Sequence, residues 1–277
     1  MNILIDIVHP AHVHLLRNFY HNMVGRGHKV VVTCKHIPSA MQLLDMYKIP
    51  YIYLGEKKDN IVLKAARSLA TACSLQPQAK IRLEKNLPIA SGIGGGSADA
   101  AAVLKALIRL WNLNIPIEKL YEIALNLGAD VPSCLASQAV QVAGIGDILT
   151  PAPVLPKLFI LLVNPNKPIS TPSVFKTRAP VFSKAAPFTQ PITDFDQFIK
   201  ALSERHNDLC EAACQIEPAV GQVLRALEKY PSCRLARMSG SGGTCFGLFP
   251  FAKEAEFVCN EMRASHPEWW FLNTIIE

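Results

Sequence analysis

The chain has 277 residues, of which half are hydrophobic and 18% are charged, with a formal net charge of +6. This composition excludes long disorder and leaves room for one large or two ordinary domains. The charge suits an anionic ligand such as a nucleotide, but no run of Lys and Arg marks a nucleic-acid groove. We therefore expect a globular protein that binds no nucleic acid.

The opening MNILIDIVHP has no basic start and carries an Asp in its apolar run, so it predicts a strand rather than a signal peptide. No apolar run is long enough to cross a bilayer, which predicts no membrane partner. The eight cysteines stand singly, without a C-x-x-C pair. This spacing predicts reduced, mostly buried thiols in a cytoplasmic protein.

The first 55 residues alternate strand and helix. Strand-like runs at Asn2–Val8, Lys29–Cys34 and Pro50–Leu54 flank helical patterns at Ala11–Arg26 and Ser39–Tyr47. Strand, helix, strand, helix, strand in this space predicts half of a doubly wound parallel sheet. The stretch through residue 58 also holds six of the eight histidines, and seven Lys/Arg against three Asp/Glu. Such a shift in composition predicts a domain boundary, with a Rossmann-like βαβαβ fragment over residues 1–55.

From Asp59 the pattern changes to longer helices and scattered strands. Nine prolines between 151 and 191 predict loops and a junction, which divides the remainder into domains at 59–150 and 151–277. We expect helices at Asn60–Ala72, Ala98–Leu110, Glu118–Leu127, 195–203 and 218–229, and strands at Lys80–Lys85, Ala139–Ala143, Leu158–Asn164 and Thr244–Phe249.

The strongest chemical signal is PIASGIGGGSADA, which follows a predicted strand and opens a predicted helix; its residues Pro88–Ser97 are called the first glycine loop below. Glycines let consecutive backbone N–H groups approach phosphate oxygens, and the helix adds its own unpaired N–H groups and positive dipole end. Ser97 caps the helix or offers a phosphate its hydroxyl. A Walker A loop needs Gly-Lys-Ser/Thr, and a dinucleotide fingerprint needs a glycine where Ser97 stands, so neither motif fits.

Two further segments carry candidate chemistry. MSGSGGT at Met238–Thr244, called the second glycine loop below, leads into a predicted strand. Alone it is compatible with an ordinary turn, but beside the first glycine loop it predicts a second wall of one anion site. In LGADVP at Leu127–Pro132, Asp130 is either a helix-end residue or a carboxylate that accepts a hydroxyl proton.

These segments in this order resemble the GHMP kinases, and P-x-x-x-G-I-G-G-G-S-A-D-A-A resembles in particular the branch that acts in the methylerythritol pathway. The matching strings, which cover about 219 of the 277 residues, are DNIVLKAAR at Asp59–Arg67, LGADVP, GIGDILTP at 144–151, STPSVFK at 170–176 and HNDL at 206–209. The fold implied is α/β and α+β, a two-domain GHMP-kinase-like fold, here preceded by the half Rossmann-type unit in place of the usual first strands.

The resemblance implies transfer of the ATP γ-phosphoryl group to the 2-hydroxyl of a CDP-linked methylerythritol in the non-mevalonate isoprenoid pathway, with Mg²⁺ accompanying ATP. It implies that Asp130 is the catalytic carboxylate, and it assigns no protein residue to a metal. The residues implied to bind ATP are Pro88, Gly92, Gly94, Gly95, Gly96 and Ser97. Those implied to bind or enclose the substrate are Thr171, Phe175, whose ring stacks on cytosine, Gly240, Gly242, Gly243 and Thr244.

The N-terminal end departs from the family. Its Pro-x-Ala-Lys-Ile-Asn-Leu strand and Asp-Gly-Tyr-His segment do not occur here, and residues 1–55 instead resemble glycosyltransferase-B-like proteins through MNILIDIVHPAHVHLLRNF. One hypothesis is therefore a kinase body with weak or no phosphoryl transfer, that is, an impaired nucleotide-binding fusion protein. Another is a nucleotide-sugar transferase with His9, His12 and His14 at the end of the first strand, but residues 59–277 do not supply the second Rossmann domain that this needs.

Overall fold

The computed structural model describes residues 2–7, 20–26, 29–34, 43–44, 46–47, 52–53, 60–76 and 79–276. The chain forms two compact units, Met1–Asn60 and Ile61–Glu277. In the first unit, strands β1 (Asn2–Ile7), β2 (Lys29–Cys34) and β3 (Ile52–Tyr53) form a parallel sheet in the order β1-β2-β3. The three predicted strands are confirmed. Of the two predicted helices, residues 20–25, 43, 44 and 46 are helical, and the rest lie outside the described residues.

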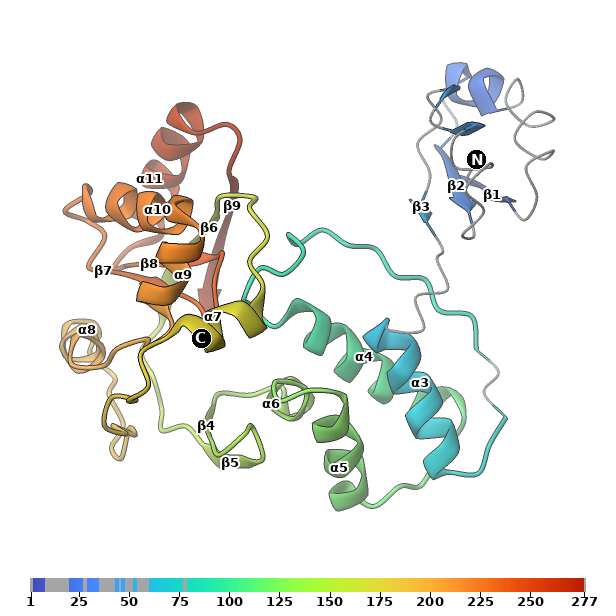
Figure 1. Ribbon diagram of the computed structural model, residues 1–277, viewed down its shortest axis with the longest axis horizontal. Coiled ribbons are helices and arrows are strands. Elements are labelled where there is room, and N and C mark those ends of the chain that lie inside the picture. Colours follow the sequence, from blue (N-terminus) through green and yellow to red (C-terminus); the bar gives the residue numbers. More distant parts are fainter. Residues whose placement is uncertain are drawn as a thin grey trace. The chain divides into compact units, whose positions relative to one another are not determined.

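The second unit begins with four helices around one core (Figure 1). They are α3 (Ile61–Ala72), α4 (Gly95–Leu110), α5 (Ile117–Leu127) and α6 (Val131–Ala136), followed by the antiparallel hairpin β4 (Val140–Ala143) and β5 (Ile148–Pro151). Leu69, Leu104 and Val131 are fully enclosed between these helices. The prediction of the first three helices is confirmed, although α4 begins three residues before Ala98.

The predicted strand Lys80–Lys85 is wrong. Residues 79–88 have no strand assignment, although Ile81 packs on the helical core while Lys80 and Arg82 are exposed. The alternation that predicted the strand is therefore present. A strand, however, also needs a neighbour for its N–H and C=O groups, and none of the described strands pairs with this segment.

The remainder of the unit is an antiparallel sheet in the order β7-β8-β6-β9, with helices on both faces (Figure 1). Its strands are β6 (Leu158–Asn164), β7 (Leu235–Met238), β8 (Cys245–Phe249) and β9 (Trp270–Ile276). Its helices are α7 (Thr171–Thr177), α8 (Phe195–Ser203), α9 (Cys210–Ile216), α10 (Pro218–Glu228) and α11 (Ala252–Ser265). The helices α10 and α11 pack on one face of the sheet and α8 on the other.

The central strand β6 contributes side chains to the hydrophobic cores on both faces of this sheet. Leu161 and Val163 point into the core with α10 and α11, whereas Leu158 and Ile160 point into the core with Phe198 of α8. Alternate residues of a strand face opposite sides, so a strand buried on both faces is mostly apolar, as the first six residues of LFILLVN are. The sheet and the helical part thus have separate cores. No helix in the part of the chain that the structure describes is long and apolar enough to cross a membrane.

Burial of cysteines predicts an alkaline loss of stability. Burial raises the pKa of Cys210, helped by the neighbouring Cys214, and that of Cys233, each to about 11 from the ordinary 9.0. Because the folded pKa exceeds the unfolded one, the stabilisation is complete below pH 9 and is lost as the pH rises through 11. We expect the urea midpoint to fall between pH 8.5 and 10.5, and to fall less in Cys233→Ala. An equal fall in both proteins would contradict this assignment.

Candidate active site

The first glycine loop is a sharply wound segment that ends at the N-terminus of α4. Ala90, Gly92 and Gly94 all have positive φ, at 52°, 71° and 69°. Gly94 is the N-cap of α4, and no side chain caps the helix. Ser97 is thus the third residue of the helix, so the capping alternative for Ser97 is wrong. The unpaired N–H groups of the first turn of α4 remain available to a ligand, as at other anion-binding helix ends.

The second glycine loop touches the first one, 147 residues away in sequence. The Ser239 hydroxyl donates to the Gly92 carbonyl at 2.8 Å, and the Thr244 N–H donates to the Ser91 carbonyl at 3.0 Å. These contacts confirm that the two glycine segments lie at one place in the fold.

Glycines at this junction are required by space as well as by φ. A Cβ atom on Gly92 would lie 2.4 Å from the Gly242 carbonyl oxygen and 2.7 Å from that of Ser239. A Cβ atom on Gly240 would lie 2.9 Å from the Gly92 carbonyl oxygen. Because the crowded atoms belong to the backbone, the loops can approach this closely only where Gly92 and Gly240 have no side chains.

Gly96 differs from the junction glycines. A Cβ atom there would make only an ordinary 3.8 Å contact with the side chain of Ile61, and its φ is not positive. The same atom on Gly95 would approach Leu87 at 3.3 Å. The fold itself therefore has little need of glycine at 96, which fits a position kept small for a ligand. Pro88 is half-buried in the extended segment that leads into the loop.

Asp130 lies at the N-cap of α6, and its side chain is exposed and makes no capping hydrogen bond. One turn later, the sulfur of Cys134 is 4.0 Å from the position of a Cβ atom on Gly94, which brings α6 against the first glycine loop. Burial raises the pKa of the Cys134 thiol, and the nearby Asp130 carboxylate raises it further. Cys134 therefore stays a neutral spacer between Asp130 and the loop.

The hairpin turn between β4 and β5 supports the backbone beside Asp130. Gly146 has a φ of 101°, and a Cβ atom there would lie 2.3 Å from the Ala129 carbonyl oxygen. The Asp147 carboxylate accepts from the Ile145 N–H at 2.9 Å and closes the turn. The turn formed by GIGD therefore packs directly against the backbone of residue 129. The sequence motif alone did not reveal this contact.

Thr171 joins the second glycine loop from a third direction. It is the first residue of α7, and its hydroxyl lies 2.7 Å from that of Ser241. The N-cap Ser170 accepts from the Ser173 N–H at 3.4 Å. Phe175 follows one turn after Thr171 and is 50% exposed. The structure brings Thr171 to the loop and leaves the Phe175 ring open to solvent.

Sequence reasoning missed two asparagines that hold the second glycine loop. Asn207 donates to the Met238 and Gly240 carbonyls, and the buried Asn164 donates to the Thr244 hydroxyl. Asn207 belongs to HNDL, which was noted only as a matching string, and Asn164 ends a predicted strand. Neither has a spacing relative to the loop that could have signalled its role.

Comparisons with known proteins give one consistent result. The profile of "GHMP kinases N terminal domain" matches residues 60–138, and that of "GHMP kinases C terminal" matches residues 188–268. The 4-diphosphocytidyl-2-C-methyl-D-erythritol kinase of Rhodospirillum rubrum is 46% identical over 258 residues, covering 91% of this chain and 84% of that protein. The protein of the same name from Paramagnetospirillum magneticum is 51% identical over 212 residues, covering 76% of this chain and 74% of that protein.

Among solved structures, a 4-(cytidine 5'-diphospho)-2C-methyl-D-erythritol kinase is similar with a TM-score of 0.64 and 28% identity, covering 80% of each chain. The resemblance of residues 1–55 to glycosyltransferase-B-like proteins finds no support in these matches. The alignment with the Rhodospirillum rubrum protein covers more of this chain than residues 61–277 comprise, so it extends into the first unit.

Proposed function

Since this chain belongs to the GHMP kinases and, within them, to the 4-diphosphocytidyl-2-C-methyl-D-erythritol kinases, we propose that it transfers the γ-phosphoryl group of ATP to the 2-hydroxyl of 4-diphosphocytidyl-2-C-methyl-D-erythritol. The observation that carries this proposal is the contact between the two glycine loops, in which the Ser239 hydroxyl donates to the Gly92 carbonyl at 2.8 Å. It closes a small, glycine-lined region at the N-terminus of α4, beside the helix that Asp130 begins.

In this proposal the first glycine loop binds the ATP phosphates. The N–H groups of Gly94, Gly95 and Gly96 and the hydroxyl of Ser97 are donors at the positive end of α4, where negative charge is stabilised. The absence of side chains allows phosphate oxygens to approach the backbone closely. Alternating positive φ values before the helix support the concave loop that this binding needs.

Asp130 is the proposed general base. Its exposed carboxylate accepts the proton of the substrate hydroxyl as that oxygen attacks the γ-phosphorus, and ADP leaves with the electrons of the broken phosphorus–oxygen bond. Freedom from a capping bond leaves the carboxylate available for this proton. The Gly146 turn against Ala129 supports a fixed backbone for it.

The Mg²⁺ in this proposal arrives on ATP. Among the described residues, no three His, Cys, Asp or Glu side chains gather so that they could hold a metal ion by themselves. When bound, the ion neutralises charge on the β- and γ-phosphate oxygens. The hydroxyl of Ser97, at the start of α4, and the carboxylate of Asp130, at the start of α6, are hard oxygen donors. These two donors fit an ion that is held mainly by the phosphates of ATP.

The substrate side is proposed to be formed by α7 and the second glycine loop. Thr171 and Ser241 share a 2.7 Å hydrogen bond there, and Gly240, Gly242, Gly243 and Thr244 belong to the same loop as Ser241. Phe175 lies one turn along α7 and stacks on the cytosine ring.

We also propose that residues 1–55 are half of a Rossmann-type unit, present in the sequence in place of the family's usual first strands. Three parallel strands in the order β1-β2-β3 support this. The separate cores of the helical part and of the C-terminal sheet support an ATP-binding domain at 59–150 and a C-terminal domain at 151–277.

The function is tested by measuring ADP formation with ATP, Mg²⁺ and 4-diphosphocytidyl-2-C-methyl-D-erythritol. We expect turnover that depends on both substrates and is abolished in Asp130→Ala. Omission of the alcohol and its replacement by mevalonate are the controls. ATP binding without turnover in the unmodified chain would instead favour the nucleotide-binding protein that has lost its chemistry.

Removal of the Phe175 ring should weaken substrate binding without affecting the fold. Because aromatic stacking contributes about 0.5–1.5 kcal/mol, Phe175→Ala should raise KM for the cytidine substrate about 2- to 13-fold. KM for ATP and the melting temperature should hardly change, since the side chain is 50% exposed. Phe257→Ala, at an exposed aromatic on α11, is the matched control. A rise in the KM for ATP instead would place Phe175 on the nucleotide side.

A further inference from the structure

Three of the seven residues of the second glycine loop are glycines, which have no side chains to fix the position of the loop. Gly240, Gly242 and Gly243 lie at its centre, and both Gly240 and Gly242 have positive φ. Glycine is the residue with the most backbone freedom, so such a segment keeps one conformation only where other groups bind it. The groups that bind it therefore determine how it meets the first glycine loop.

Asn207 binds one end of the loop through its amide. Its Nδ2 donates to the Met238 carbonyl at 3.0 Å and to the Gly240 carbonyl at 2.9 Å, while its Oδ1 accepts from the Leu209 N–H at 3.0 Å. Both amide hydrogens and the carbonyl oxygen are thus in use, and exchange of N and O would leave all three contacts unfavourable. The two donated bonds lie on either side of Ser239.

Ser239 is the residue that reaches the first glycine loop. Its hydroxyl donates to the Gly92 carbonyl at 2.8 Å, and a Cβ atom on neighbouring Gly240 would lie 2.9 Å from the same oxygen. A shift of residues 238–240 by even a fraction of an ångström therefore changes the position of the Gly92 carbonyl, which lies two residues before the helix N-cap Gly94. Asn207 is thus one contact removed from the loop proposed to bind phosphate.

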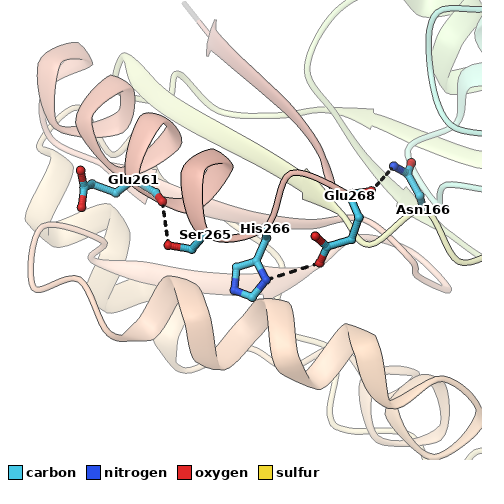
Figure 2. Close-up of polar contacts among 5 residues, drawn as sticks. All are labelled: Asn166, Glu261, Ser265, His266 and Glu268. Atoms are coloured by element: carbon cyan, nitrogen blue, oxygen red, sulfur yellow. Dashed lines mark hydrogen bonds and ion pairs between the residues drawn. The ribbon is translucent and has the colours of Figure 1, made fainter.

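The other end of the loop is tied to the core. Asn164 is 2% exposed, donates to the Thr244 hydroxyl at 2.9 Å and accepts from the Asn166 N–H at 2.8 Å. Figure 2 shows the next contact outward, in which the Asn166 side chain donates to the Glu268 carbonyl at 2.7 Å, beside His266 in the turn after α11. This end is anchored through the interior of the domain, so Asn207 at the half-buried end is the anchor that can be altered without opening the core.

We propose that Asn207 is a positioning residue for phosphate binding: its amide fixes the turn Met238–Gly240 and, through Ser239, the shape of the first glycine loop. The inference rests on the proposed function for its ligand, but the loop geometry it invokes can be measured without ligand. It predicts that the hydrogen-bond donors of Asn207, rather than its volume, set the affinity for ATP.

Two variants separate donors from volume. Asn207→Asp keeps the size and the acceptor for Leu209 but sets a carboxylate oxygen against two carbonyls, whereas Asn207→Ala removes the donors without adding repulsion. Two carbonyls that lose their shared donor and face a carboxylate oxygen instead are destabilised, so we expect the Kd for an ATP analogue to rise about 10- to 100-fold in Asn207→Asp, with Asn207→Ala between it and the unmodified chain. A role in packing alone would give the reverse order, because Ala removes the most volume. Asn260→Asp on the exposed side of α11 is the matched control.

Hydrogen exchange without nucleotide gives the independent readout. The N–H groups of Ser239, Gly242 and Thr244 are all bonded, to the carbonyls of Thr244, Ser239 and Ser91. Their exchange should be slowest in the unmodified chain, faster in Asn207→Ala and fastest in Asn207→Asp. Unchanged exchange together with unchanged analogue binding in Asn207→Asp would overturn the inference, as would greater effects in Asn207→Ala. If the unmodified chain binds no ATP, the proposed function fails, and the exchange order alone supports or overturns the role of Asn207.

Discussion

Asp130→Asn should lower kcat about 10²- to 10⁴-fold, the range over which a positioned general base contributes to catalysis. Asparagine has the size of aspartate but cannot accept the hydroxyl proton. The carboxylate is exposed and makes no capping hydrogen bond to α6, so little of the fold depends on its charge. KM for ATP and the melting temperature should therefore stay close to those of the unmodified chain. Steady-state ADP formation measures kcat and KM, and thermal unfolding measures the melting temperature.

Asp196→Asn is the matched control, because Asp196 is an exposed aspartate of α8 whose ion pair with Arg234 spans 3.0 Å at the surface. Exposed pairs of this kind contribute little to stability. Its kcat should be unchanged. Retention of more than a tenth of kcat in Asp130→Asn would exclude Asp130 as the base. A large loss of melting temperature would show that its carboxylate supports α6 rather than the reaction.

Gly92→Ala should abolish ATP binding and also weaken the fold. The new Cβ atom would lie 2.4 Å from the Gly242 carbonyl oxygen, and the residue would keep a φ of 71°. A left-handed residue costs about 1–2 kcal/mol and overpacking about 1–3 kcal/mol, so we expect the melting temperature to fall by roughly 5–15 °C. The two loops must separate to admit the methyl group. Titration with an ATP analogue should show at least about a 100-fold loss of affinity, which corresponds to about 2.7 kcal/mol of binding free energy.

Gly96→Ala separates the fold from the ligand site. Its Cβ atom has an ordinary 3.8 Å contact with Ile61, and alanine in a helix is favoured over glycine by about 1 kcal/mol. The melting temperature should rise slightly while the affinity for ATP falls, because the methyl group occupies space proposed for phosphate. Gly25→Ala, where nothing lies within 4 Å of the added atom, controls for the substitution itself. Unchanged ATP affinity in both Gly92→Ala and Gly96→Ala would exclude this loop as the phosphate site.

The sequence by itself determined the elements whose signals are local. The apolar run of β6, the amphipathic helices α3, α5 and α10, and the glycine run before α4 were all predicted, because each pattern is contained within one continuous helix, strand or loop. The family assignment is also local in origin, since it rested on short strings in a fixed order, and the profile matches confirm it.

Several short elements were missed where local signals are weak, and the longer helix α11 and strand β9 were not predicted either. The helices α6, α7 and α9 are six or seven residues long, and the strand β5 has four. Elements of this length are stabilised by packing rather than by propensity. The strand predicted at Lys80–Lys85 failed for the opposite reason, because its alternation is genuine and its pairing partner is not found among the described residues.

The motifs of the candidate site could be recognised in the sequence, but the geometry that brings them together was decided only by tertiary structure. Gly92 and Ser239 are 147 positions apart, and Asn207 bonds carbonyls 31 and 33 positions away. No periodicity links residues at such separations, because their contact depends on how the helical part packs beside the C-terminal sheet. The motifs in the sequence could thus suggest Gly92, Asp130 and Thr171 as candidates, and their roles stay predictions. Only the packed chain decides that a hydroxyl on one loop and an asparagine amide behind it fix the other loop, because hydrogen bonds form between atoms that the whole fold has brought within 3 Å.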